Sequence, residues 1–287
     1  MRSRAFAIIA AVLMAGAILS LPGASPAQAA SAGWIVTCNY ARSAPDDPIV
    51  APGVSGGAHL HDFLGNKTTA ATSTYQTMTS AGSTCGTATD LAAYWAPAML
   101  RSDGTQVRPT GTFAGRSTRQ RVYYRADNLR TGTKVEAFPA DLRLVAGNSH
   151  ATSPADNPEL GGAIYWGCSD NSTGKLKAPP ASCSTGIITL HVGFPNCWDG
   201  VLTHKNDTAH VRYPSGGVCP TGFGRALPRI IERMEYPVGT TTGSVKLSSG
   251  PTWTAHADFW NTWNQPALSR LVANCLNAGV DCGKDPA

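Results

Sequence analysis

A segment near the start of the chain, residues 56–66, carries residues that could do chemistry. His59 and His61 are separated by one position, so in an extended strand both imidazoles point to the same face. Such a pair is a common way of placing two nitrogen ligands on one metal ion. Asp62 follows directly and adds a carboxylate that could move a proton.

Two later segments, residues 194–200 and 256–261, carry the same residue types. Each combines aromatic residues with groups that can titrate. We expect these segments and the first one to meet in one cleft, although they are far apart in the sequence. The residues of these segments that could act on or bind a substrate are Trp198, Asp199, His256 and Asp258. His210, just downstream of the first of them, is a further candidate.

A divalent metal is the first cofactor that these residues indicate. His59, His61 and His256 are the predicted ligands, because a catalytic zinc site uses three such ligands plus water. The sequence leaves other third ligands open, namely His204, His210 and Asp258. Copper is also an option in an exported protein, although the expected mature chain does not begin with histidine. The competing interpretation is that these histidines hydrogen-bond backbone carbonyls in a loop-rich core.

Metal-free acid–base chemistry is a second interpretation of the same residues. Asp62, Asp199 and Asp258 lie within the aromatic motifs. Two carboxyl groups about 5–10 Å apart would suit hydrolysis of a glycosidic bond. Histidine could replace one of them as the proton carrier. The alternative is structural, because aspartate is also typical of turns and loop caps. The predicted catalytic residues are His59, His61, Asp62, Asp199 and Asp258.

Binding without catalysis is a third interpretation. Trp95 and Trp198 could stack on sugar rings, while Asn66 and His210 bind hydroxyl groups. These four are the predicted substrate-binding residues. The competing interpretation places most of the tryptophans in the core.

The N-terminus predicts export. Residues 1–29 combine two arginines, an apolar run and an Ala-Gln-Ala cleavage site, which is the pattern of a secretory signal peptide. A transmembrane anchor is the alternative, but the run is short and a small-residue site follows it. We therefore expect a secreted protein whose mature chain has no membrane segment.

Charge and composition limit the choice of partner. The formal net charge of +5 falls to +3 without the two arginines of the signal, and 14% of the residues are charged. No dense basic run occurs, so nucleic-acid binding is not expected. A surface rich in Ser, Thr, Asn and Gly instead suits a protein that works on polysaccharide or cell-wall material, and we expect a monomer.

All eight cysteines follow the signal, and an even number in an exported chain indicates disulfides. Many pairings are possible for such a number. Proximity in the sequence favours three pairs and leaves a fourth, which gives Cys168–Cys183, Cys197–Cys219, Cys275–Cys282 and Cys38–Cys85.

Short strands must position these residues. β-branched and aromatic residues predict strands at 33–40, 119–124, 162–168, 186–195, 230–236 and 252–259. Residues 90–100 are predicted to form an edge strand because they contain Pro97. A short helix is expected near residues 75–80, and an amphipathic helix at 266–278. The chain therefore predicts a single mainly-β domain over residues 30–287, sandwich or jelly-roll-like, with long loops and one C-terminal helix.

The motifs, taken in order, resemble one known family. They are His59-x-His61-Asp62-Phe63, Tyr94-Trp95-x-Pro97, Phe194-Pro195-x-Cys197-Trp198-Asp199-Gly200, His210-x-x-Tyr213-Pro214 and His256-x-Asp258-Phe259. Over roughly residues 53–263 the chain resembles the secreted family catalogued as domain of unknown function nineteen ninety-six, found in fungi and bacteria. That family has no established activity. Its members are often exported and sometimes joined to sugar-binding modules, so the resemblance implies a carbohydrate target.

Two functions follow as predictions. The first is a carbohydrate-active hydrolase or lyase, with a divalent metal in its strongest form. The second is a non-catalytic protein that binds polysaccharide or cell-wall material through the same cleft.

Overall fold

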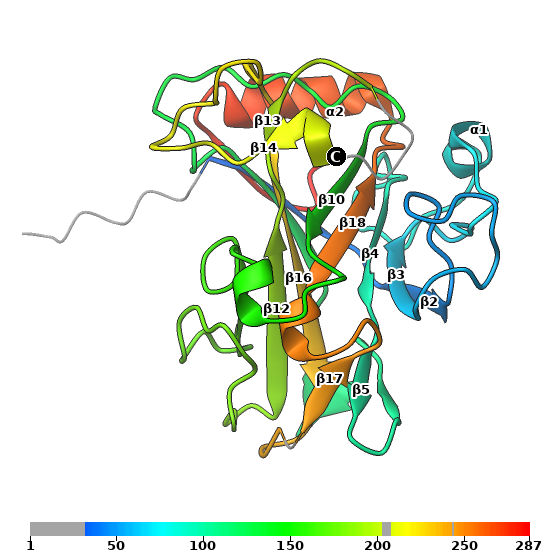
Figure 1. Cartoon of the computed structure of the whole chain (residues 1–287). Helices are drawn as coiled ribbons and strands as arrows, with labels where there is room; N and C mark the ends of the chain where they lie inside the picture. The colour runs from blue at the N-terminus through cyan, green and yellow to red at the C-terminus, as the bar shows by residue number, and fades with distance from the viewer. Residues whose placement is uncertain (1–31, 203–207, 243) are drawn as a thin grey trace, which may run out of the picture. The chain divides into compact units, whose positions relative to one another are not determined.

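Two β-sheets carry most of the strands of the protein (Figure 1). The computed structural model describes residues 32–202, 208–242 and 244–287. The predicted signal, residues 1–29, lies outside the described residues. One sheet has six strands and the other has five, which confirms the prediction of a mainly-β fold.

The six-stranded sheet contains the strongest strand sequences of the chain, such as Ile-Ile-Thr-Leu-His-Val. Its neighbouring strands are antiparallel except for the last pair, β1 and β19, which is parallel. In spatial order the strands are β11 (Ile164–Cys168), β12 (Ile187–Gly193), β16 (Arg229–Pro237), β9 (Arg121–Arg125), β1 (Gly33–Thr37) and β19 (Asp281–Lys284).

The five-stranded sheet is antiparallel throughout. The predicted edge position of residues 90–100 is wrong, because β4 is the central strand of this sheet. Pro97 is the last residue of β4, and the next residue donates instead, from Ala98 N to Leu60 O at 2.8 Å. The spatial order is β10 (Arg143–Gly147), β18 (His256–Trp260), β4 (Ala93–Pro97), β3 (His61–Gly65) and β2 (Tyr40–Ala44).

The main core lies between the two sheets. Tyr94 of β4 and Tyr124 of β9 bring their hydroxyl oxygens to 2.5 Å of each other. Trp34 of β1 stacks on Tyr124 with ring centroids 4.6 Å apart, and Tyr94 packs on Phe259 of β18. These contacts join side chains from both sheets, so the two sheets form a sandwich.

A second apolar cluster covers the other face of the five-stranded sheet. Phe63, Trp95 and Trp260 project from β3, β4 and β18, and they pack with Ile49 and Met78 from the chain between β2 and β4. The short helix α1 (Tyr75–Thr79), which confirms the predicted helix, belongs to this covering segment. Since side chains alternate along a strand, this outer face also receives alternate residues of β3 and β18.

Shorter elements connect the sheets. The predicted strand at residues 252–259 begins only at His256, because a 3-10 turn, η3 (Thr252–Thr254), follows Pro251. The other short strands are β5 (Met99–Arg101), β6 (Gln106–Val107), β7 (Thr112–Phe113), β8 (Arg116–Ser117), β13 (Cys197–Trp198), β14 (Val211–Arg212), β15 (Arg225–Ala226) and β17 (Val245–Leu247). The remaining 3-10 turns are η1 (Pro154–Asp156) and η2 (Thr208–His210).

The C-terminal helix lies across one end of the strands (Figure 1). α2 (Gln265–Leu271) continues as a π-helical turn, η4 (Val272–Leu276), close to the predicted span of 266–278. Asn264 caps the helix by accepting a hydrogen bond from Ala267 N at 3.1 Å. The predicted apolar face is buried.

All four predicted disulfides are present: Cys38–Cys85, Cys168–Cys183, Cys197–Cys219 and Cys275–Cys282. They agree with an oxidising compartment. Within the described residues, no helix has the length and apolar character needed to cross a membrane.

Candidate functional site

Three histidines from distant parts of the sequence meet at the outer face of the five-stranded sheet. The Nε2 atoms of His59 and His256 lie 3.0 Å apart. The ring of His61 lies 4.3 Å from that of His59 and 5.8 Å from that of His256, measured between centroids. One ligand atom from each of the three can be chosen so that all lie within 4.8 Å of one another.

Strand register explains this convergence. β4 lies between β3 and β18, and its Pro97 stands opposite His61. Asp258 stands opposite Trp95 on the other side of β4, so the same register brings His256 level with Pro97. His59 precedes β3 in the loop rather than sharing the strand with His61, as the spacing had suggested, but its ring still packs against that of His61.

Backbone hydrogen bonds orient two of the three imidazoles. His61 Nδ1 lies 3.0 Å from Asp46 O, and His256 Nδ1 lies 2.8 Å from Thr254 O. A carbonyl oxygen can only accept, so in both rings Nδ1 carries the hydrogen and Nε2 keeps its lone pair. Histidines that bind metals are oriented in this way by their second nitrogen.

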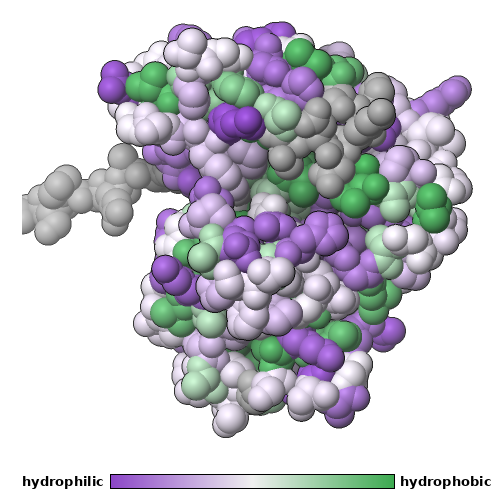
Figure 2. All heavy atoms as spheres, viewed as in Figure 1, coloured by the Kyte–Doolittle hydropathy of each residue, from purple (hydrophilic) through white to green (hydrophobic). Residues whose placement is uncertain are grey.

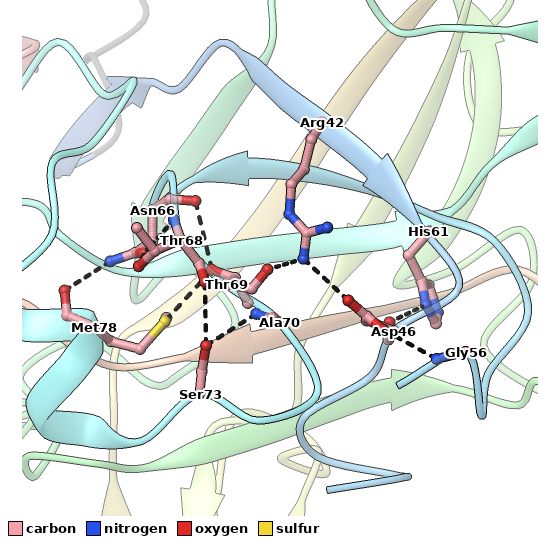
Figure 3. Close-up of polar contacts among 10 residues, drawn as sticks. All are labelled: Arg42, Asp46, Gly56, His61, Asn66, Thr68, Thr69, Ala70, Ser73 and Met78. Carbon is pink, nitrogen blue, oxygen red and sulfur yellow. Dashed lines mark hydrogen bonds and ion pairs between the residues drawn. The ribbon is translucent and has the colours of Figure 1, made fainter. Parts of the chain in front are cut away.

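Asp46 is itself fixed by a polar network, which Figure 3 shows beside His61. Its carboxylate accepts from Arg42 Nη2 at 3.3 Å and from Gly56 N at 3.2 Å. The same Arg42 nitrogen donates to the backbone oxygen of Thr69. Arg42 therefore holds the carbonyl of Asp46 against His61.

Two buried carboxyl groups face His61 as well. Asp47 Oδ2 lies 3.9 Å from His61 Nε2, and Asp47, His61 and Asp258 together form a second group with ligand atoms within 4.8 Å. His61 and Asp258 are fully buried, at 0% exposure. Neither oxygen of Asp258 has a hydrogen-bond partner among the described residues, and the same holds for His61 Nε2. Such buried unpartnered acceptors are rare and costly unless a cation or a proton joins them.

Burial controls the charge of these groups. It is the main cause that lowers the pKa of His59 to about 4 and that of His256 to about 3, and neighbouring histidines contribute to the lowering at His256. Burial also holds the pKa of His61 well below its usual value. The imidazoles are therefore neutral at pH 7. In contrast, burial raises the pKa of Asp47 and of Asp258.

His59 and His256 open into a pocket of about 530 Å³. Asp47, His59 and His256 line it, and the loop after β10 adds His150. A further hollow of about 240 Å³ adjoins it at Gly147 and is lined by the segments that carry β13 and β14. Figure 2 shows this side of the molecule hollowed between those segments and the loop after β10.

Asp62, a predicted catalytic residue, does not join the histidines. It follows His61 on β3, and alternation turns it to the opposite face of the sheet. There its Oδ1 accepts from Ser43 Oγ at 2.6 Å and from Gln106 Nε2 at 2.7 Å. Burial raises the pKa of this carboxyl to about 7.

Asp199, His210 and Trp198 form a separate cluster. His210 Nδ1 lies 2.6 Å from Asp199 Oδ2. Trp198 is nearly buried, donates to Val201 O at 2.9 Å, and stacks under Arg225. This cluster contributes no atom to the three-histidine group. His204, an alternative third ligand, lies outside the described residues.

Two other predicted binding residues are buried. Trp95 has 0% exposure and packs on Phe63 in the outer apolar cluster. Asn66 donates to Met78 O and Leu91 O, each at 2.8 Å. Its side chain therefore ties the covering segment to the sheet.

Sequence reasoning missed Asp47 and His150. Asp47 lies in a Pro- and Gly-rich loop, where aspartate is ordinarily a turn residue. It does have that role, because its Oδ1 accepts from Ile49 N and Val50 N at 2.8 Å each. Asp47 follows Asp46 directly. This acidic pair, which precedes the histidine segment, is the feature of the sequence that could have indicated a carboxyl group near the histidines.

Comparison with known proteins identifies the family. A family model described as Domain of unknown function (DUF1996) matches residues 47–263. The match covers most of the chain, so the chain belongs to this family. No curated protein and no solved structure matches it.

Proposed function

We propose that this member of the DUF1996 family is a secreted metalloenzyme that cleaves carbohydrate polymers. It binds one divalent transition-metal ion through His59, His61 and His256. The observation that carries the proposal is the meeting of these neutral imidazoles beside two buried carboxyl groups. His61 Nε2 and both oxygens of Asp258 lack hydrogen-bond partners among the described residues, and a bound cation would satisfy them together.

The donor set favours zinc. Three imidazoles with a carboxylate are a donor set typical of zinc, and imidazole also suits copper, iron and nickel. Zn–N bonds of about 2.0–2.1 Å in tetrahedral geometry place two nitrogen ligands about 3.3 Å apart. The 3.0 Å between His59 Nε2 and His256 Nε2 is close to that spacing.

The two carboxyl groups have different surroundings and therefore different proposed roles. Asp258 is fully buried and does not line the pocket, so it would act as a further ligand or neutralise the charge of a bound ion. Asp47 lines the pocket, and its Oδ1 is already held by backbone N–H groups. Its Oδ2 would be the group that accepts a proton if a bound metal supplied an activated water.

The pocket supports a polar substrate. Besides the histidines and Asp47, its lining includes Asn148, Ser149 and His150, whose side chains can hydrogen-bond hydroxyl groups. Water activated by the metal is a nucleophile for hydrolysis. The Ser-, Thr- and Asn-rich composition supports polysaccharide as the substrate class.

The proposal is tested with a panel of polysaccharides and the protein in three states: chelator-treated, reloaded with Zn²⁺, and reloaded with Mg²⁺. We expect reducing ends to appear only with Zn²⁺ or another transition metal, and not with His256→Ala in any state. A new unsaturated sugar absorbance would identify a lyase instead of a hydrolase. Equal cleavage after chelation would contradict a metalloenzyme, and metal binding without cleavage would favour the binding protein.

A further inference from the structure

We propose a second binding surface, on the outer face of the six-stranded sheet, that binds acidic polysaccharide chains. We call it the cationic face. It does not depend on the metal centre, which lies on the other sheet. Its residues are Arg116, Arg119, Arg121, Tyr165, Lys175, Thr189, His191, Arg233 and Glu235.

Strand register assembles this face. Tyr165 stands opposite His191, His191 opposite Arg233, and Arg233 opposite Arg121, on four neighbouring strands. Adjacent strands are about 4.8 Å apart, so the four side chains form a continuous row. Thr189 and Glu235 form the next pair on the same face.

Two hollows adjoin along this row. One, of about 510 Å³, is lined by Arg116, Arg119, Arg121 and Glu235. The other, of about 200 Å³, is lined by Tyr165, Lys175, Thr189 and His191. The pairing of Thr189 with Glu235 makes them neighbours, so an extended chain can occupy both.

The β7–β8 hairpin brings Arg116 to the first hollow. It is anchored by Phe113, which packs on Gly186 just before β12. A Cβ added to Gly186 would lie 2.1 Å from the Phe113 ring. The hairpin is therefore seated closely on the sheet.

The charge of the face is strongly positive. The guanidinium groups of Arg116, Arg119 and Arg121 have no carboxylate partner among the described residues. Glu235 lines the first hollow, and it is already engaged by Arg233 and by the backbone N–H of Arg119. The free arginines therefore have no counter-charge within the face.

One polar group in the second hollow also lacks a partner. Thr189 is fully buried, and its Oγ1 has no hydrogen-bond partner among the described residues. It lines the hollow beside His191, whose ring is mostly buried against Tyr165. A ligand hydroxyl would satisfy the Thr189 oxygen.

These features favour an acidic sugar chain over a nucleic acid. Guanidinium groups bind carboxylates in a bidentate way, and the hydroxyls of a sugar match Thr189 and His191. Single-stranded nucleic acids need free aromatic faces on which bases stack. Tyr165 offers none, because His191 stacks on one side at 4.2 Å and the Lys175 ammonium lies 5.1 Å from the ring centroid.

The test compares two matched triple variants of the full mature chain. Arg116→Gln/Arg119→Gln/Arg121→Gln removes three charges from the face, and Arg108→Gln/Arg130→Gln/Arg270→Gln removes three exposed charges elsewhere. Binding to polygalacturonate, to its methyl ester and to duplex DNA is measured by titration at two salt concentrations. Thermal unfolding of both variants checks that they fold.

We expect polygalacturonate binding that weakens with salt and falls at least about tenfold in the first variant. The control variant should bind as the wild type does. The methyl ester should bind weakly. No binding by the wild type, equal loss in both triple variants, or DNA binding as tight as polygalacturonate would overturn the proposal.

Discussion

His61 links the two groups of acceptors at the candidate site. His61 belongs to the three-histidine group, and its Nε2 lies 3.9 Å from Asp47 Oδ2. The hydrogen bond from His61 Nδ1 to Asp46 O fixes the orientation of the ring. The Nε2 atom therefore cannot turn away unless that hydrogen bond is lost. A lone pair held toward a carboxyl group is unfavourable unless a proton or a cation lies between them.

Asp258 tests this description at the scale of one residue. Both of its oxygens are buried without a partner, so in metal-free protein the carboxyl lowers stability. Asp258→Asn should therefore stabilise chelator-treated protein by about 1–3 kcal/mol at pH 7, while reducing the rise in Tm that Zn²⁺ produces. Thermal unfolding with chelator and with Zn²⁺ measures both effects.

Asp103→Asn is the control, because Asp103 is exposed in a turn and should change neither value. An unchanged response to Zn²⁺ in Asp258→Asn would mean that this carboxyl has no part in the site.

At the scale of elements, the close approach of β10 to β18 positions His256. Gly147, the last residue of β10, has φ +89°, and an added Cβ would lie 2.3 Å from Ala255 O and 2.8 Å from His256 Cα. A side chain at this position would therefore displace the start of β18. Glycine is needed here both for its φ and for the space it leaves.

Gly147→Ala should lower the free energy of unfolding by more than about 1 kcal/mol and weaken Zn²⁺ binding. Gly104→Ala is a matched control, since Gly104 has φ +86° and nothing within 4 Å of an added Cβ. It carries the same backbone strain without the contact. Urea unfolding and zinc titration compare the two, and equal effects would show that crowding of His256 is unimportant.

Alternation along strands explains which site residues could be predicted from the sequence. The period of two puts His256 and Asp258 of β18 on one face, whereas it was applied to His59 and His61, and His59 lies in the loop before β3. By the same rule the neighbours His61 and Asp62 point to opposite faces of the sheet. The prediction that they act in one catalytic set is therefore inconsistent with alternation. Asp47 could not be predicted, because its position beside His61 depends on a loop that folds over the sheet.

At the scale of the whole molecule, one ionisable group lies unpaired in the main core. Glu232 of β16 is 1% exposed, and neither carboxyl oxygen has a hydrogen-bond partner among the described residues. Burial raises its pKa well above the usual value. Sequence periodicity predicted the strand but could not reveal this, because glutamate on a strand is ordinarily exposed.

Glu232 should make stability fall as pH rises. Below the pKa of an unfolded glutamate both states keep the proton, and nothing is lost. Above it the unfolded chain releases its proton while the folded chain does not. The free energy of unfolding therefore falls by about 1.4 kcal/mol per pH unit until the pH reaches the pKa of the folded state. Glu232→Gln removes this loss, so its stability relative to the wild type should increase from pH 5 to pH 8 in urea unfolding. A constant difference across this range would contradict the assignment.

The fold and the disulfides were largely predictable, for physical reasons. Strands with β-branched residues form sheets wherever they pair, and cysteines that are close in the sequence meet at low entropic cost. The order of strands in the sheets depends on contacts between distant residues, which is why β4 was wrongly placed at an edge. The convergence of the histidines depends on the same order.

The central claim is that His59, His61 and His256 bind one metal ion, and calorimetric titration of Zn²⁺ into chelator-treated protein tests it most directly. We predict one equivalent bound by the wild type and by His210→Ala, whose histidine lies outside the group. His59→Ala and His256→Ala should each bind at least about a hundredfold more weakly. Absence of binding by the wild type, or equal affinity in all four proteins, would contradict the claim.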